Sequence, residues 1–340
     1  MSNLIRVLIV DDSAFARKVL REVLTQSPLI EVVGIARDGL EALEKFGELK
    51  PDVVTLDLVM PNLDGLGVLD ALPMADRARV LVVSTVASES DLAISALERG
   101  AFDLVTKPTA LATARLYEMG SELILKIKAA ALAKVGRATA PVARERPTLH
   151  RAPRKLVVIG TSTGGPQALT RVLTSLPADF PLPIAVALHI PAGYTDALAR
   201  RLNQAAKIEV VEAENGVELR PGRAVIARGG LHLRLQSHGE SLTGWLSSVP
   251  SDSVHFPSVD VLFESAVEQC GGGVVGVVLT GMGDDGRKGA AAIHRAGGLV
   301  ITESASSCVV YGMPRAVVES GLSNAEVSLE GLAAFLSTEL

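Results

Sequence analysis

The stretch VVIGTSTGGP (Val157–Pro166) is an apolar run that ends in hydroxyl side chains and paired glycines. A short apolar run followed by Gly and Pro is typical of a β-strand that turns sharply into an α-helix, with Pro166 in the helix's first turn. Similar apolar runs recur along the chain, each followed by a loop or a helical pattern. The sequence therefore predicts an α/β fold with mostly parallel sheets.

The second half of the chain, residues 154–340, contains four runs that predict buried parallel strands. They are KLVVIG (155–160), PIAVALHI (183–190), GRAVIARGG (222–230) and GGVVGVVLTG (272–281). The segment LHLRLQSHGESLTGWLSS (231–248) alternates apolar and polar residues on both sides of a turn. This alternation predicts a hairpin beside the main sheet.

The first half, residues 1–125, contains five runs that predict a doubly wound, five-stranded parallel sheet. They are RVLIV (6–10), EVVGIA (31–36), VVTL (53–56), VLVV (80–83) and FDLVT (102–106). A helix is expected after the first run, with Ser13 as its N-cap and Pro28 beyond its end. Five apolar residues are expected on one face of this helix: Phe15, Val19, Leu20, Val23 and Leu24.

Residues 126–153 differ from both halves because basic residues accumulate there among Ala, Pro and Thr, and Glu145 is the only acid. This composition predicts a solvated interdomain linker, whose first part extends the last helix of the first domain. A nucleic-acid-binding arm is the alternative, but the stretch has no aromatic residue on which a base could stack. The linker is the better interpretation.

The bulk composition is that of a two-domain globular protein: 340 residues, 48% hydrophobic and 21% charged. A net charge of -5 argues against a surface that binds nucleic acid throughout. The two cysteines, Cys270 and Cys308, suggest thiols in a reducing compartment rather than a disulfide framework. No signal-peptide core or bilayer-length apolar run is found, so we expect a cytoplasmic protein without membrane insertion.

The turn at Gly160–Pro166 matches neither of the common phosphate-binding loops. A Walker loop needs Lys and Ser/Thr after its second glycine, where Pro166 and Gln167 stand, and the glycines lack the spacing of a dinucleotide fingerprint. GTSTG does fit the G-x-S-x-G pattern of a serine nucleophile between a strand and a helix. Ser162 is therefore a candidate nucleophile, with a helix N-cap as the alternative.

A serine nucleophile needs a base and an orienting acid. Among six histidines, His189 ends an apolar run at the same expected sheet edge as Ser162, and His255 is a less favoured candidate. Asp284 and Asp285 follow another buried run; one would orient the imidazole and the other cap a helix near Gly286, and spacing does not decide which. The order Ser, His, Asp differs from that of α/β-hydrolases.

In the first half, the ends of the predicted strands carry an acidic cluster with a lysine. Asp11, Asp12 and Asp57 are joined there by Ser84 with Thr85 and by Lys107. Carboxylates gathered at one edge repel one another unless a hard cation lies among them, which favours Mg²⁺. One carboxylate then serves as a nucleophile towards a phosphoryl group. The alternative is that each acid only caps a helix.

The motifs VDD, LDLVMP, VVST and VTKP resemble the receiver domain of two-component response regulators over about the first 120 residues. The resemblance implies that Asp57 is the phosphoacceptor and that Ser84, Thr85 and Lys107 form the switch. It also implies that Mg²⁺ is held by Asp11, Asp12, Asp57 and the backbone carbonyl of Val59. Leu104 stands where many receivers have an aromatic switch residue.

The motifs IGTSTGGP, HIPAGYT, AENG, PGRAVIA, PSVDVLF, LTGMGDDG and YGMPRA resemble the catalytic domain of chemotaxis protein-glutamate methylesterases, the CheB family, over Lys155–Val318. The resemblance implies Ser162 as nucleophile, His189 as base and Asp285 as orienting acid. It places Thr163 beside the nucleophile and the Met282 N–H in the oxyanion hole. Two departures are Arg228, where proline is usual, and Phe256, where arginine is common.

Together the two resemblances imply a chemotaxis enzyme activated by phosphorylation, whose unphosphorylated receiver covers the catalytic face. It would hydrolyse glutamate methyl esters on chemoreceptors, releasing methanol, and deamidate receptor glutamines. The expected phosphodonor is a chemotaxis histidine kinase, Mg²⁺ is needed in the receiver alone, and the protein is a monomer. The alternatives are a non-enzymatic adaptor, a DNA-binding response regulator and a hydrolase of small esters.

Overall fold

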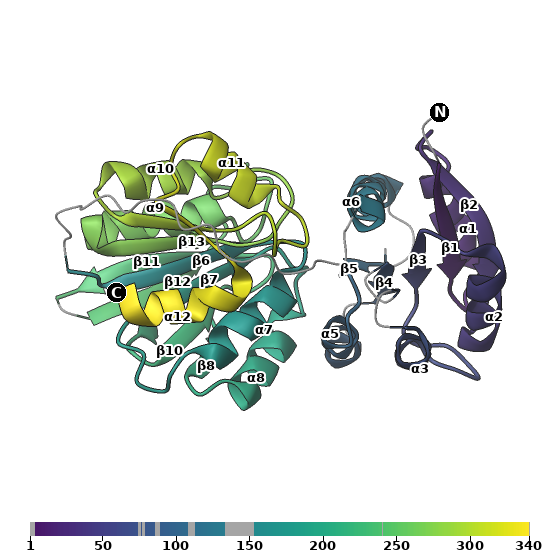
Figure 1. The fold of residues 1–340 in the computed structure, drawn as a ribbon, viewed down its shortest axis with the longest axis horizontal. Helices are drawn as coiled ribbons and strands as arrows, with labels where there is room; N and C mark the ends of the chain where they lie inside the picture. The colour runs from purple at the N-terminus through teal and green to yellow at the C-terminus, as the bar shows by residue number, and fades with distance from the viewer. Residues whose placement is uncertain are drawn as a thin grey trace. The chain divides into compact units, whose positions relative to one another are not determined.

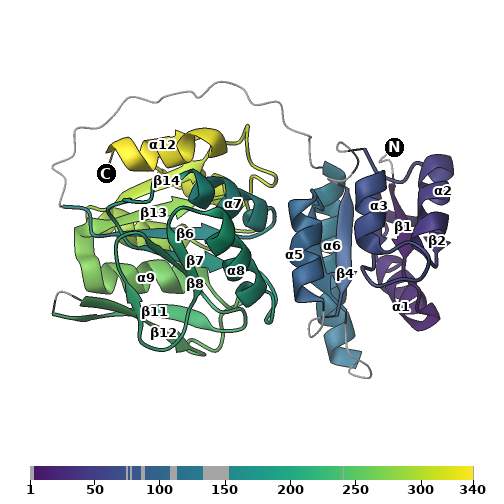
Figure 2. The ribbon, with the colours of Figure 1, turned by 90° about the horizontal axis from the view of Figure 1, so that it is seen from below.

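The computed structural model describes residues 4–73, 76, 79–85, 89–107, 113–132, 153–239 and 241–339, with the side chains of 113–119 excepted. The chain divides into two compact units, Met1–Val135 and Gly136–Leu340 (Figures 1 and 2). Each is an α/β unit built on its own sheet, as the sequence predicts.

The first unit contains a five-stranded sheet in the order β2-β1-β3-β4-β5, and all its neighbouring strands are parallel. The strands are β1 (Ile5–Val10), β2 (Ile30–Ala36), β3 (Val53–Leu56), β4 (Val80–Ser84) and β5 (Asp103–Thr106). The helices are α1 (Ala14–Leu24), α2 (Gly39–Leu49), α3 (Gly65–Ala71), α5 (Ser90–Glu98) and α6 (Thr113–Leu132). The strand order changes direction at β1 and β3, where an open sheet of this kind places its functional groups.

Helix α1 begins as predicted, because the side chain of Ser13 accepts a hydrogen bond from the Ala16 N–H. Its buried residues are Leu20, Val23 and Leu24. The expectation that Phe15 shares this buried face is wrong, since Phe15 is 63% exposed. Phe15 lies in the first turn of the helix, ahead of the buried residues Leu20, Val23 and Leu24.

Helix α6 continues to Leu132, beyond residue 125 where the linker was expected to begin. Ile127 and Ala130 are buried, and the buried Lys126 Nζ donates to the Leu104 carbonyl at 2.7 Å and pairs with Asp103 at 3.2 Å. These contacts attach the helix to β5, and Asp103 neutralises the charge of Lys126 within the first unit. Residues 133–152 of the expected linker lie outside the described ranges.

The second unit contains a seven-stranded sheet in the order β15-β14-β13-β6-β7-β10-β8, and its neighbouring strands are all parallel. The strands are β6 (Leu156–Thr161), β7 (Ile184–Leu188), β8 (Glu209–Glu212), β10 (Arg223–Ile226), β13 (Val274–Val278), β14 (Leu299–Glu303) and β15 (Ala325–Val327). The sequence predicted β6, β7, β10 and β13 and did not include β8, β14 and β15.

Helices cover both faces of this sheet. Figure 1 shows α9, α10 and α11 on one side and α7, α8 and α12 on the other. They span α7 (Gly165–Ser175), α8 (Thr195–Ala205), α9 (Val259–Cys270), α10 (Arg287–Arg295), α11 (Met313–Glu319) and α12 (Leu329–Glu339), and a 3₁₀ turn follows α9 at Gly271–Gly273. Cys270 and Cys308 are both free thiols, as expected.

The predicted hairpin forms from β11 (His232–His238) and β12 (Ser241–Ser247), which pair in antiparallel fashion. A short strand, β9 (Val217–Leu219), adds to β12 and completes a separate three-stranded sheet that α9 contacts through β11. Within the described part of the chain, no helix is long and apolar enough to cross a membrane.

The two ends of α1 should respond differently to truncation. Leu24→Ala removes a fully buried side chain and should lower the free energy of unfolding by about 2–5 kcal/mol. Phe15→Ala, at an exposed position, should change it by about 0.5 kcal/mol or less. Urea denaturation of the full chain, followed by circular dichroism, measures both; a larger loss for Phe15→Ala would contradict the observed orientation of α1.

Candidate functional site

The turn after β6 carries Ser162 at a partly buried position rather than at a helix cap. The backbone reverses at Gly164, whose φ of 79° is in the left-handed region, and α7 begins at Gly165 with Pro166 in its first turn. Gly164 is the N-cap residue, and no side chain caps this helix. The alternative interpretation of Ser162 as an N-cap is therefore wrong.

Strand register brings His189 beside this turn. Thr161 of β6 pairs with Leu188 of β7, and the His189 N–H donates to the Thr161 carbonyl at 3.0 Å. Because the strands are parallel, the residues that follow them, Ser162 and His189, emerge together at the carboxyl edge of the sheet.

Thr280, just after β13, ties the nucleophile turn to its surroundings. Its carbonyl accepts from the Ser162 N–H at 3.1 Å and from the Thr161 hydroxyl at 2.7 Å, and its own hydroxyl donates to the Thr163 carbonyl at 3.0 Å. Its N–H donates to Glu303 Oε2 at 2.8 Å. Glu303 is fully buried, and this burial raises the pKa of its carboxyl group.

Asp285 lies between His189 and the first turn of α9. His189 Nε2 is 2.8 Å from Asp285 Oδ2, while the N–H groups of Val259 and Asp260 and the Ser258 hydroxyl donate to the same carboxylate at 2.7, 2.9 and 3.0 Å. Burial alone would raise the pKa of Asp285, but the contacts with His189 and the backbone N–H groups hold it below the usual value. The carboxylate is thus ionised.

Asp284 has a different environment. Its side chain is 65% exposed and pairs with Arg287 at 3.0 Å. The residue before α10 is Gly286, and neither acid provides a side-chain cap for that helix, so the expected capping role near Gly286 is wrong. The carboxylate that orients the imidazole, Asp285, instead receives the N–H groups at the start of α9.

The remaining ring nitrogen of His189 is available as a base. With the Nε2–H donating to Asp285, Nδ1 is buried and has no hydrogen-bond partner among the described residues. Ser162 Oγ likewise makes no hydrogen bond there, so the proton-transfer contact is not formed in this structure. Buried polar atoms without partners are uncommon, and serine–histidine contacts often tighten only when substrate binds.

The loop after β13 passes close to Ser162 at Gly281. A Cβ added to Gly281 would stand 2.8 Å from Ser162 Cβ, so the chain approaches the nucleophile closely at this glycine. The N–H of the next residue, Met282, has no partner within the described parts of the chain. Thr163 is 2% exposed and follows the nucleophile directly. The structure thus places Gly281, the residue before Met282, against Ser162, and the role of the Met282 N–H stays a prediction.

Of the other histidines, His232 is satisfied within the core. Its Nε2 bonds the Pro250 carbonyl and its Nδ1 accepts from the Ser258 N–H, each at 3.1 Å, and burial lowers its pKa. Phe256, which departs from the family pattern, packs on the His232 ring at 4.4 Å between centroids. Arg228, the other departure, pairs with Glu212 at 3.0 Å.

His255 is not the base but is in contact with it. Its ring stacks on that of His189, with centroids 3.9 Å apart and an interplanar angle of 17°. Its sequence position made His255 only a less favoured candidate base and gave no sign of this contact. His238 and His294 are exposed, and His150 lies outside the described ranges.

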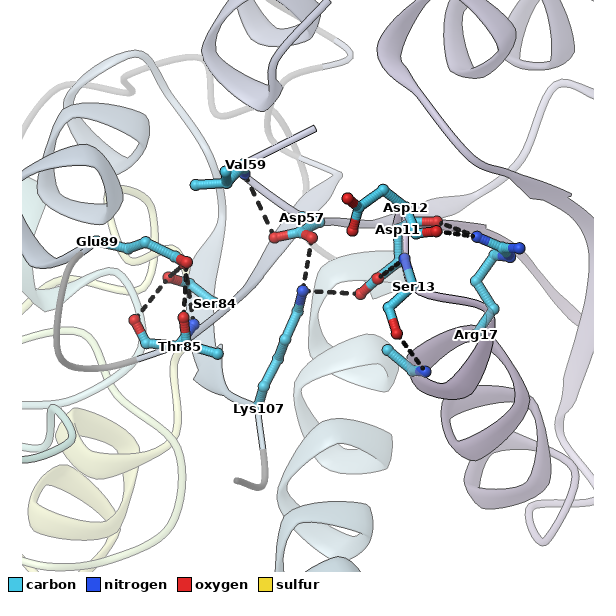
Figure 3. A network of polar contacts seen from close by, with 11 residues as sticks. Asp11, Asp12, Ser13, Arg17, Asp57, Val59, Ser84, Thr85, Glu89 and Lys107 are labelled. Carbon is cyan, nitrogen blue, oxygen red and sulfur yellow. Dashed lines mark hydrogen bonds and ion pairs between the residues drawn. The ribbon is translucent and has the colours of Figure 1, made fainter. Parts of the chain in front are cut away.

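In the first unit, the predicted acidic cluster forms at the ends of β1, β3 and β5 (Figure 3). Asp11 and Asp57 are buried, and Lys107 Nζ lies between them, 2.9 Å from Asp11 Oδ2 and 2.6 Å from Asp57 Oδ2. Burial raises the pKa of Asp57, against the opposing effect of Lys107. The neighbouring acids Asp38 and Asp64 do cap helices, whereas this cluster does not.

The cluster fits a divalent cation. Carboxylate oxygens of Asp11, Asp12 and Asp57 lie within 4.8 Å of one another, and Lys107 compensates only one of the three charges. Oxygen donors with excess negative charge are what Mg²⁺ requires. Val59 lies beside the cluster, with its N–H donating to Asp57 Oδ1 at 3.4 Å; the role of its carbonyl stays a prediction.

Glu89 is a member of this site that sequence reasoning missed. Ser84 Oγ donates to Glu89 Oε2 at 2.5 Å, and Thr85 donates through its N–H at 3.0 Å and its hydroxyl at 2.6 Å (Figure 3). Burial opposes these bonds, but they hold the pKa of Glu89 below its usual value. Both predicted switch hydroxyls are thus held by one carboxylate. The sequence signal that could have identified Glu89 is its position shortly after Ser84 and Thr85, the two hydroxyl residues at the end of β4.

Leu104, which stands where many receiver domains have an aromatic residue, is fully buried in β5. Its carbonyl accepts from Lys126 of α6. The side chain therefore belongs to the core of the first unit.

Two family profiles match the chain. CheB methylesterase matches residues 157–336, and the response regulator receiver domain matches residues 7–118. A protein-glutamate methylesterase/protein-glutamine glutaminase 5 from Myxococcus xanthus (strain DK1622) is 61% identical over 98% of this chain and 97% of its own length. The protein-glutamate methylesterase/protein-glutamine glutaminase of Symbiobacterium thermophilum is 44% identical over 97% of this chain and 95% of its own.

Among solved structures, the CheB methylesterase catalytic domain of Thermotoga maritima is 38% identical and matches with a TM-score of 0.54. The match covers 56% of this chain and 100% of that one. The similarity thus extends to the arrangement of the second unit's strands and helices.

The carboxyl group of Asp260 should make stability depend on pH. Burial, with Asp285 and Glu264 nearby, raises its pKa from 3.8 to about 6. Between these two pH values the folded state holds a proton that the unfolded state has lost, so the free energy of unfolding falls as the pH rises from about 3.8 to about 6. Asp260→Asn should therefore raise the free energy of unfolding by about 1–2 kcal/mol at pH 8, allowing for solvent screening of this partly exposed group, and by little at pH 4.

The matched control is Asp284→Asn, which removes an exposed carboxylate from the loop between β13 and α10 and should have little effect at either pH. Chemical denaturation at the two pH values gives the comparison. An equal effect of Asp260→Asn at both would show that ionisation is not the cause.

Proposed function

Because this chain belongs to the CheB methylesterase family and carries a response-regulator receiver domain, we propose that Ser162, His189 and Asp285 catalyse its protein-glutamate methylesterase reaction. The observation that carries the assignment is the meeting of three strand ends, where Asp285 orients His189 at 2.8 Å and leaves Nδ1 without a partner beside Ser162. The enzyme is a carboxylic ester hydrolase. The names of its relatives also include a protein-glutamine glutaminase activity.

In the proposed mechanism, Ser162 Oγ attacks the ester carbonyl of a methylated glutamate while its proton passes to His189 Nδ1. Asp285 stabilises the imidazolium that results, and the Met282 N–H donates to the oxyanion. His189 then gives the proton to the departing methoxide, so that methanol leaves and an acyl-enzyme remains. Water, deprotonated by His189, hydrolyses it to the glutamate carboxylate. A glutamine substrate follows the same route and releases ammonia.

The receiver controls this reaction through phosphorylation. We assign Asp57 as the phosphoacceptor, with Lys107 placed to neutralise the added phosphoryl charge and Ser84 to bond its oxygen. Asp11, Asp12, Asp57 and the Val59 carbonyl would hold Mg²⁺, which would supply further charge neutralisation for phosphoryl transfer. A phosphoryl group adds about -1.5 to -2 charge, enough to rearrange local contacts.

The remaining assignments follow from the family. The substrate is a methyl-accepting chemoreceptor and the phosphodonor a chemotaxis histidine kinase; the protein works as a cytoplasmic monomer, with Mg²⁺ as its only cofactor. We divide the chain into a receiver, a basic linker and a catalytic domain that begins near residue 154, counting α6 to Leu132 with the receiver. A hydrolase of small esters is the alternative within the same chemistry.

Ser162→Ala should abolish methanol release. By analogy with serine-hydrolase triads, turnover should fall on the order of 10⁶-fold, because the variant lacks the hydroxyl that forms the acyl-enzyme. The assay incubates the protein with membranes holding radiolabelled methylated receptor and counts volatile methanol. The control Ser175→Ala lies at the exposed end of α7 and should remain active. Near-normal release by Ser162→Ala would refute the assignment.

Asp57→Ala should separate catalysis from its regulation. The variant keeps Ser162, His189 and Asp285, so it should retain basal methanol release while acetyl phosphate no longer stimulates it. Asp52→Ala, in the same unit but outside the acidic cluster, should still respond. Stimulation of Asp57→Ala equal to that of the wild type would show that another group accepts the phosphoryl.

A further inference from the structure

His255 covers one face of the His189 ring. The two imidazoles are nearly parallel, with centroids 3.9 Å apart. His255 begins the segment that leads into α9, and this same segment supplies Ser258, Val259 and Asp260 as donors to Asp285. One short stretch of chain therefore contacts both the base and its orienting acid.

The polar contacts of His189 leave its ring incompletely held. Within the described residues, Nε2 is bonded to Asp285 and Nδ1 to nothing, so a single hydrogen bond on one edge orients the ring. A ring fixed at one atom can still tilt, and a tilt moves Nδ1 relative to Ser162. A flat partner against its face opposes that movement, because aromatic rings packed face to face attract each other.

The backbone around His255 is itself anchored. The Ser253 hydroxyl donates to the His255 carbonyl at 3.1 Å, and the Gly230 N–H donates to the Phe256 carbonyl at 3.0 Å. The Phe256 ring packs on His232, which is buried and accepts from the Ser258 N–H. The stacking partner is thus carried on a segment that is anchored to the core through Phe256 and Ser258.

We propose that His255 is a positioning residue, which holds the ring of His189 so that Nδ1 faces the proton of Ser162. The inference rests on the proposed function of Ser162 and His189. His255 takes no proton in the reaction, since the hydrogen bond to Asp285 belongs to His189. Its contribution is the flat ring, so another aromatic side chain should replace it and a non-aromatic one should not.

The test compares methanol release by His255→Ala, His255→Gln and His255→Phe in the full-length protein. The two variants without a ring should lose on the order of 10-fold in kcat, with KM within about twofold, since the contact orients the base and not the substrate. His255→Phe should recover kcat to within about threefold of the wild type. Val254→Ala, one position earlier and 88% exposed, is the control and should be unaffected.

Circular dichroism and thermal unfolding identify variants that fold. A folded variant without the ring that keeps wild-type kcat would overturn the proposal, and so would a His255→Phe variant as impaired as His255→Gln. A loss confined to KM would also overturn it, because it would indicate contact with substrate. If the wild type itself released no methanol, the proposed function would fail and this inference with it.

Discussion

The carboxylate of Asp285 connects the fold of the catalytic unit to its chemistry. It accepts hydrogen bonds from the N–H groups at the start of α9 and from the imidazole of His189. One carboxylate therefore both stabilises the first turn of a helix and orients a base. The helix lies against β6 so closely that a Cβ on Gly160 would stand 2.1 Å from Val259 Cγ1. The strand that carries Ser162 and the helix that holds Asp285 are therefore fixed relative to each other by packing.

Both units place their reactive groups at the carboxyl edge of a parallel sheet, but they balance charge differently. Around Asp285, backbone N–H groups and a histidine surround one ionised acid, and its neighbour Asp260 has its pKa raised to about 6. Around Asp57, three carboxylates meet a single lysine, which leaves an excess that favours a cation. The first arrangement suits general base catalysis and the second suits phosphoryl transfer.

The sequence allowed the strands that carry function to be predicted, because an apolar run that ends in Ser, His or Asp is a local signal. It did not reveal β8, whose EVVE pattern is half polar, or β15, which is three residues long, while β14 has a clear apolar pattern that the prediction omitted. The distinction between Asp284 and Asp285 depended on α9, which is distant in sequence. The contacts of Glu89 and His255 likewise arise only from folding, because a contact between side chains in the folded protein produces no periodic pattern in the sequence.

The bonds around Thr280 have a consequence for how such an enzyme is regulated. They join the end of β6, the residues after β13 and the buried Glu303, so several bonds at once hold the turn that carries Ser162. A regulator that leaves these bonds intact therefore acts on the approach of substrate and not on the shape of the turn itself.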